Sequence, residues 1–331
     1  MEPPELELLK APTAAAPPCG PSLEDSPELA AFNAYRVFGQ STAWEQPPDW
    51  RELRGRALET LGRSKDIRIL AHFAAAALRT DGLAALLASL GVAADWLEGF
   101  WEGVYPGLDE EGIFRRNALS CFADRIAIID ALRRAPLVAN RQLGAFSLRD
   151  HELAQGTLQP TEADTHVKDA AQVAAAFAAM EGAELAALVG QVEAAQAALK
   201  RIETKTREAI GTEGTPDLQP LAQQLQKILA LLREQLAAHP SGAGADAAAG
   251  GAAEGAAGGG VGGPIRSRQD AIRALDAVAA FFRQTEPSSP VPLFVERAKR
   301  LVAKSFLEVL EDMMPDSVAQ ARQVGGVREA E

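Results

Sequence analysis

One tract of the chain, residues 241–263, contains ten glycines and nine alanines among its 23 residues and has no periodic apolar pattern. Glycine gives an unfolded backbone the most conformational freedom, and this composition offers too few large apolar side chains to build a core. A flexible linker of this length spans about 25 Å on average. We therefore assign residues 240–263 to a flexible Gly/Ala linker and predict that the chain folds as separate parts on its two sides.

The composition outside the linker favours helices. Aromatic residues make up only 5% of the chain, while hydrophobic residues make up 47%, many of them alanine. A β-sandwich would need more β-branched and aromatic residues, so we predict an all-α protein. The formal net charge of −12 lies wholly before residue 264, because the remainder has ten basic and ten acidic residues. Such a surface repels phosphate backbones, so we expect no nucleic-acid partner.

The first part of the chain predicts an arm followed by a helical domain. Nine of the 20 prolines lie within the first 48 residues, which predicts an extended Pro-rich arm over 1–25. Apolar residues at helical spacing then predict a domain over 26–145, starting with Ser26 as a cap. The expected helices cover 26–39, 50–61, 64–80 with Ser64 as the cap, 83–103 with an interruption near Gly91, and 109–136.

Residues 160–239 predict a middle helical region after a connection with short turns. Its apolar stripe is thin, and its cleanest run has steps of three and four residues: Leu221, Leu225, Ile228, Leu232 and Leu236. Sustained heptads are absent. This pattern favours a solvent-bridging helical hairpin over a long coiled coil.

The part after the linker predicts a small helical domain over 264–322 and a tail over 323–331. About 60 ordered residues bury little surface, which makes independent stability marginal. The adjacent Phe281 and Phe282 cannot both face one small core, and Leu293 and Phe294 repeat that pattern. We therefore expect this domain to self-associate. The residues assigned to this interface are Phe281, Phe282, Pro287, Ser288, Ser289, Pro290, Leu293, Phe294, Arg297, Lys299 and Arg300.

The basic residues of that set allow two interpretations. Arg297, Lys299 and Arg300 form either a solvated helix face or a contact with an acidic partner or a neighbouring subunit.

The sequence offers no pattern typical of a catalytic, metal or cofactor site. The four histidines lie in unrelated segments without ligand spacing, and no phosphate-binding loop, dinucleotide fingerprint or nucleophile elbow is found. Cys19 and Cys121 give no disulfide framework. The acidic, proline-containing start lacks the features of a signal peptide, and the longest apolar stretch has 12 residues. We expect no enzyme, no cofactor, no membrane insertion and a cytoplasmic location. A hydrolase with an unseen site is the alternative from another class.

A set of motifs indicates a family. They are Gly20–Pro–Ser–Leu, Asp49–Trp50, Ser64–Lys–Asp–Ile–Arg68, Gly82–Leu83, Trp101–Glu–Gly–Val–Tyr–Pro–Gly–Leu–Asp109, Arg115–Arg–Asn–Ala–Leu119 and Pro136–Leu137. Over 50–137 the chain resembles the ImpA N-terminal domain, the defining module of TssA proteins in the bacterial type VI secretion system. The runs 265–268, 286–293 and 297–302 resemble the short type of TssA. The motif residues singled out are Trp50, Lys65, Asp66, Trp101, Tyr105, Pro106, Asp109 and Arg115.

The resemblance implies a structural role. Short TssA proteins oligomerise through their C-terminal domain into a ring at the baseplate of the contractile tail, and help to recruit baseplate, tube and sheath components. The N-terminal domains would then project on the linker as many partner-binding arms. Alternatives are a distal sheath cap or assembly chaperone of the same system, or a monomeric helical adaptor.

Overall fold

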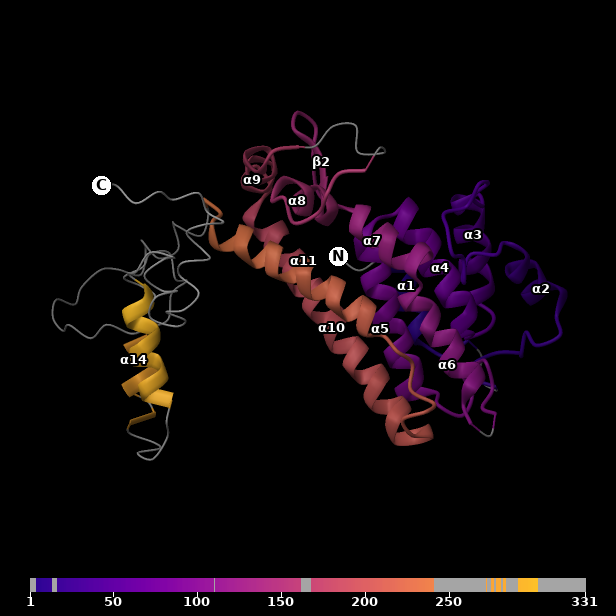
Figure 1. Ribbon diagram of the computed structural model, residues 1–331. Coiled ribbons are helices and arrows are strands. Elements are labelled where there is room, and N and C mark those ends of the chain that lie inside the picture. The colour runs from indigo at the N-terminus through magenta and orange to yellow at the C-terminus, as the bar shows by residue number, and fades with distance from the viewer. Residues whose placement is uncertain are drawn as a thin grey trace, which may run out of the picture. The chain divides into compact units, whose positions relative to one another are not determined.

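A computed structural model describes residues 4–13, 17–109, 111–161, 168–240, 272, 275–276, 278–280, 282–283 and 291–302. The chain divides into two compact units, Met1–Gly251 and Ala252–Glu331. Within the described residues almost all regular structure is helical, which confirms the all-α prediction (Figure 1).

The centre of the first unit is a pair of apolar helices. The turn at Asp81 and Gly82 reverses the chain between them, and Gly82 has a φ of 90°, which favours glycine. Most side chains of this pair are buried, because other helices cover it from several sides. The helices of this part are α1 (Pro4–Lys10), α2 (Pro27–Ala34), α3 (Trp50–Leu61), α4 (Ile67–Thr80) and α5 (Leu83–Gly99).

The expected continuous helix over 109–136 is wrong. The chain instead forms α6 (Ile113–Ser120), a 3₁₀ turn (Cys121–Ala123), a π-helical turn (Arg125–Asp130) and α7 (Ala131–Arg134). The break has a clear cause, since the Asp124 carboxylate accepts hydrogen bonds from the backbone N–H groups of Ile126 and Ala127. An aspartate in this role begins a new helical segment.

A small hairpin, which the sequence analysis did not predict, follows α7. Strands β1 (Pro136–Asn140) and β2 (Gly144–Ser147) pair antiparallel. The Asn140 side chain accepts hydrogen bonds from the N–H groups of Gln142 and Leu143, which closes the turn. Ser147 and Asp150 then form a capping box at the start of α8 (Leu148–Ala154).

The middle region forms α9 (Ala170–Ala178), α10 (Gly182–Ile210) and α11 (Gln219–Ala237). The predicted stripe of α11 is confirmed, because Leu221, Leu225, Ile228 and Leu232 are buried. The expectation of a solvent-bridging hairpin is wrong, since α10 lies along α5 (Figure 1). Arg201 of α10 also bridges to Asp95 and Glu98 of α5 at 2.7 and 2.5 Å.

Three further expectations for the first unit are corrected. The arm over 1–25 is not wholly extended, because α1 buries Leu6 and Leu9, and Pro4 at its first position needs no N–H partner. Asp66 and not Ser64 caps α4, since its carboxylate accepts from the Arg68 N–H at 2.9 Å. Helix α5 continues through Gly91, and α2 ends at Ala34 instead of Gly39.

The described part of the second unit contains α14 (Val291–Val302) and residues of a preceding helical segment. Ala279 and Val295 are buried there. Arg283 donates to Glu296 at 2.9 Å, and Lys299 pairs with Asp276. The expected third helix of this domain and the linker lie outside the described residues. The linker and domain boundaries therefore stay predictions.

Candidate functional site

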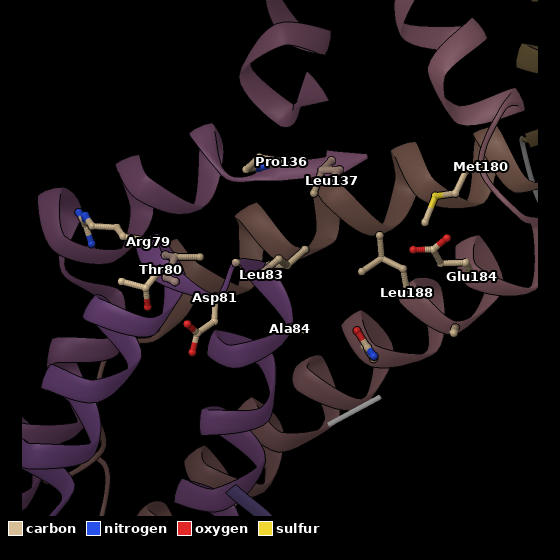
Figure 2. A pocket seen from close by; sticks show the side chains of 14 residues that line it. Arg79, Thr80, Asp81, Leu83, Ala84, Pro136, Leu137, Met180, Glu184 and Leu188 are labelled. Atoms are coloured by element: carbon tan, nitrogen blue, oxygen red, sulfur yellow. The ribbon is translucent and has the colours of Figure 1, made fainter. Parts of the chain in front are cut away.

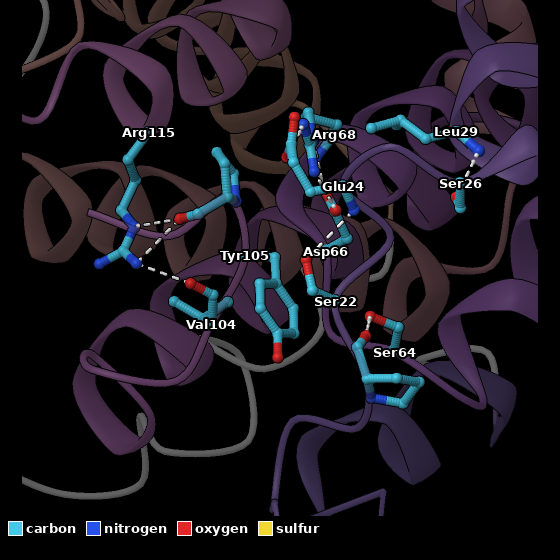
Figure 3. Close-up of polar contacts among 12 residues, drawn as sticks. Ser22, Glu24, Ser26, Leu29, Ser64, Asp66, Arg68, Val104, Tyr105 and Arg115 are labelled. Atoms are coloured by element: carbon cyan, nitrogen blue, oxygen red, sulfur yellow. Dashed lines mark hydrogen bonds and ion pairs between the residues drawn. The ribbon is translucent and has the colours of Figure 1, made fainter. Parts of the chain in front are cut away.

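Four of the seven motif segments converge at one place in the first unit, which we call the motif junction (residues 19–24, 64–68, 101–109 and Arg115). Figure 3 shows part of it. Its framework is a parallel bridge between Asp66 and Tyr105. The Ile67 N–H donates to the Tyr105 carbonyl at 2.8 Å, and the Tyr105 N–H donates to the Lys65 carbonyl at 2.9 Å. Segments about forty residues apart in sequence are thereby held edge to edge.

Arg115 organises the loop 101–109 from inside. Its guanidinium is buried and donates to the carbonyls of Trp101 at 2.8 Å, Val104 at 2.6 Å and Pro106 at 3.0 Å. The Trp101 ring lies 4.7 Å from the guanidinium carbon. Burial lowers the pKa of Arg115 to about 10. A buried cation satisfied by carbonyl oxygens and a ring fixes the shape of a loop and leaves few of its donors for a ligand.

Lys65 fixes the N-terminal helix α1 by a similar contact to a backbone carbonyl. Its buried ammonium donates to the Leu9 carbonyl at 2.5 Å, and Trp96 Nε1 donates to the same oxygen at 2.7 Å. The ammonium also lies 4.9 Å and 5.2 Å from the ring centroids of Trp96 and Phe100. Burial lowers its pKa from 10.5 to about 8. The carbonyl at the end of α1 is therefore the anchor of that helix.

An ion-pair chain lies on the outer side of the junction. Arg68 binds both oxygens of the buried Asp66 carboxylate, at 3.0 and 2.7 Å, and one oxygen of Glu24 at 2.9 Å (Figure 3). The bonds to Asp66 and Glu24 raise the pKa of Arg68 against the opposing effect of burial. A bidentate pair of this kind holds the guanidinium in one orientation.

The segment at Gly20 is tied down by two hydroxyl groups. Tyr105 Oη donates to the Gly20 carbonyl at 3.1 Å, and Ser64 Oγ donates to the Pro21 carbonyl at 2.8 Å. Gly20 has a φ of 73°, and a Cβ there would lie 1.9 Å from the Arg63 carbonyl oxygen. Only glycine fits this position.

Cys19 lies in the same segment and is buried. The structure places it near Lys65 and Arg115, yet burial dominates and raises the pKa of its thiol. The thiol therefore carries no sign of nucleophilic activation.

Trp50, also a motif residue, lies outside the junction. Its ring stacks on Arg79 at 4.2 Å, with Trp44 on the same guanidinium at 5.3 Å. Arg79 donates to the carbonyls of Ala75 and Ala127 at 2.8 and 2.7 Å, and burial lowers its pKa to about 10. The sequence analysis did not single out Arg79, because an arginine near a helix end is typical of a solvated position.

The residues expected at the C-terminal interface are described only in part. Leu293 and Phe294 of α14 are 75% and 67% exposed, while Phe282 is half-buried. Arg297 is exposed, and Lys299 is occupied by Asp276 and Glu296. Phe281, Pro287, Ser288, Ser289, Pro290 and the Arg300 side chain lie outside the described residues.

Two pockets in the first unit are of interest. The larger, of about 550 Å³, lies at the turn between α4 and α5, beside β1 and α10 (Figure 2). Its charged side chains are already engaged in part, since Asp81 pairs with Arg54 and Arg79 binds carbonyls. The smaller, of about 320 Å³, adjoins the motif junction and is lined by the exposed Phe114. We call the smaller one the Phe114 pocket.

The Phe114 pocket is also lined by Glu24, His72 and Cys121, but Glu24 pairs with Arg68, and burial lowers the pKa of His72 and raises that of Cys121. In the part of the chain that the structure describes, no three His, Cys, Asp or Glu side chains are grouped to hold a metal ion. The strongly shifted pKa values there belong to Lys65, Arg79 and Arg115, which bind backbone carbonyls, to the buried Cys121 thiol, and to Arg201, whose pKa is raised by its bonds to Glu98 and Asp95. Among the described helices, no single one is long and apolar enough to cross a bilayer, although the bent pair α9–α10 passes by length and composition.

The comparisons with known proteins first define the domain. The model of the family "ImpA, N-terminal, type VI secretion system" matches residues 10–132, the part that contains the whole motif junction. The solved N-terminal domain of the TssA component of the type VI secretion system from Burkholderia cenocepacia shares the fold, with a TM-score of 0.57 at 23% identity. That match covers 72% of this chain and 96% of the other. The first unit is therefore an ImpA-type N-terminal domain in fold.

A second relative matches almost the whole chain. The type VI secretion system component TssA1 of Pseudomonas aeruginosa is 32% identical over 97% of this chain and 98% of its own length. The chain belongs to the TssA family of type VI secretion system components.

Proposed function

We propose that the protein is a structural component of the secretion apparatus that self-associates through its second unit and presents its first unit to partners. The observation that carries this proposal is the surface of α14, where Leu293 and Phe294 are 75% and 67% exposed next to the buried Val295. Adjacent large apolar side chains left in water are typical of a surface that another chain covers. The predicted linker would let each first unit reach its partner from a common assembly.

The partners we propose are further copies of this chain and the baseplate, tube and sheath proteins of the same apparatus, on its cytoplasmic side. Membership of the family supports a role within this machinery, and the ring and the recruitment of partners are the further part of the proposal. We propose no catalytic step. The buried cations of the motif junction support this, because their donors are committed to backbone carbonyls.

The test is the solution mass of the full chain, measured by light scattering on a sizing column. We expect a discrete multimer, and we expect Phe294→Asp to reduce it to a monomer, because burying an unpaired charge is costly. Ala280→Asp is the matched control, since Ala280 is an exposed helical residue of the same unit and receives the same charge. A monomeric wild-type chain would support the monomeric adaptor instead, and an unchanged multimer in Phe294→Asp would remove α14 from the interface.

A further inference from the structure

The Phe114 pocket lies where the α2 region, the start of α4, the loop after Tyr105 and α6 meet. Its apolar walls come from Phe38, Pro106, Phe114 and Ala118. Phe114 is 62% exposed at the rim, although a cavity adjoins it. A phenylalanine kept in water beside an apolar hollow is typical of a binding surface, because a ligand would bury both together.

The size of the pocket limits what it can hold. Its volume of about 320 Å³ is near the lower end of the range for ligand sites, roughly 300–1,000 Å³. One large side chain with its flanking backbone fits such a space. Interfaces that depend on a single apolar anchor have pockets of this kind.

Two amide side chains on the rim are available for a ligand's backbone. Asn33 at the end of α2 and Asn117 of α6 both line the pocket and are exposed. Within the part of the chain that the structure describes, neither side-chain amide makes a hydrogen bond. Each offers a carbonyl oxygen and an NH₂ group, which is the pair that a peptide bond requires.

The charges of the pocket favour a cation. Arg68 is shared between Asp66 and Glu24, so the three groups together carry one negative charge. The Glu24 side chain is 59% exposed, and only its Oε2 binds Arg68. Two further titratable side chains line the pocket, His72 and Cys121. His72 is buried against Phe32 and Phe38, and burial lowers its pKa and keeps it neutral. Burial raises the pKa of the Cys121 thiol to about 12, so it is neutral as well. An anionic ligand would therefore be repelled, and a lysine or arginine could pair with Glu24.

We propose that the Phe114 pocket binds an extended peptide segment of a partner protein through one large apolar side chain, next to a lysine or arginine that pairs with Glu24. The apolar side chain fills the space beside Phe114, and the backbone on either side bonds to Asn33 and Asn117. The net charge of −12 before residue 264 steers such a basic segment toward this unit. The site lies in the first unit, so it does not depend on self-association through α14.

The test uses the full chain and fluorescein-labelled eight-residue peptides of glycine and serine that carry one phenylalanine and, two positions later, one lysine. We expect binding in fluorescence anisotropy that weakens about tenfold when the phenylalanine becomes alanine. Replacing the lysine by glutamate should weaken binding by a similar factor, because Glu24 then repels the peptide. No binding at peptide concentrations up to about 1 mM, or tighter binding of the glutamate peptide, overturns the proposal.

Paired variants locate the site. Asn117→Trp covers the pocket from an exposed position and should abolish binding, whereas Ala171→Trp, on exposed α9, should not. Glu24→Gln should reduce binding of the lysine peptide. Asp25→Asn is the control, because it removes the same charge one residue away and should leave binding unchanged. The variant should retain the fold, since asparagine tolerates the left-handed backbone at this position, where φ is 58°.

Equal binding by Asn117→Trp and the wild-type chain would overturn the assignment to this pocket. Circular dichroism of each variant checks that the fold is retained. Light scattering of the same samples reports on self-association, so a failure of the pocket and a failure of the α14 interface are distinguishable.

Discussion

The helices around the motif junction and the α10–α11 hairpin both pack on α5, yet they are stabilised by different contacts. At the junction, the cations Lys65 and Arg115 donate to backbone carbonyls and lie against tryptophan rings. In the hairpin, an aliphatic stripe is buried, and the ion pair between its two helices, Arg233 with Glu193, lies at the surface. Directional bonds therefore fix the irregular loops of this fold, whereas nonspecific burial is enough for its regular helices.

The largest loss of stability is expected from a substitution of Arg115, at the centre of the motif junction. Arg115→Met removes the donors of three carbonyl oxygens, each of which costs about 1–3 kcal/mol when buried without a partner. We expect the free energy of unfolding to fall by about 3–5 kcal/mol in urea denaturation. Arg116→Met is the control, since its side chain makes one exposed bond to the Glu213 carbonyl and should cost less than about 1 kcal/mol. Equal effects of the two variants would contradict a special role for the buried guanidinium.

The second prediction concerns the hairpin stripe. Leu225 of α11 is wholly buried, and Leu225→Ala leaves a cavity that the rigid helices cannot close. We expect a loss of about 2–4 kcal/mol in the same measurement. Leu236→Ala, at a half-buried position of the same helix, should cost clearly less. A negligible effect of Leu225→Ala would show that the hairpin is not stabilised by its stripe.

These two sites also show what the sequence could and could not predict. The α11 stripe was predicted because helical periodicity reports directly which side chains are buried. The burial of Lys65 and Arg115 was not predicted, because an analysis of periodicity treats a charged residue as a surface residue. The family resemblance singled out both without giving their contacts. Helix α1 was missed because prolines dominate its surroundings, and its stability depends on the distant Lys65 and Trp96.

The Phe114 pocket also could not be predicted from the sequence. Its wall residues come from four separate stretches, 24–38, 68–72, Pro106 and 114–121, and only Pro106 was among the residues singled out in advance. Nothing in the sequence marks Phe114 as exposed, since a large apolar residue within a helical segment is more often buried. Its exposure depends on how α6 is turned by the Arg115 bonds to the loop before it.

The third prediction concerns the pH dependence of stability that the buried Lys65 causes. Because burial lowers the pKa of Lys65 from 10.5 to about 8, the unfolded chain holds this proton more tightly than the folded chain. Unfolding therefore takes up a proton between about pH 8 and 10.5, and this group's contribution to stability rises with pH across that window. The full gain is at most about 3 kcal/mol.

The measurement compares the wild-type chain with Lys65→Met by urea unfolding at several pH values. We expect the stability difference in favour of the wild-type chain to widen as pH rises, because other titrating groups cancel in the difference. A difference that stays constant or narrows would mean that the Lys65 ammonium is not destabilised by burial. A Leu225→Ala chain provides the control, since its deficit should not depend on the charge of Lys65.

The smallest expected effect is at the surface of the hairpin. Arg233 pairs with Glu193 at 2.6 Å, with side chains 60% and 44% exposed, so water and salt screen the attraction. We expect Arg233→Gln to lower the free energy of unfolding by about 0.2–1 kcal/mol, and a double-mutant cycle with Glu193→Gln to give a coupling that fades in high salt. A loss as large as that of Leu225→Ala would mean that charge, and not the stripe, joins α10 to α11. The hairpin would then resemble the junction, where named polar contacts carry the stability, and the contrast between the two regions would fail.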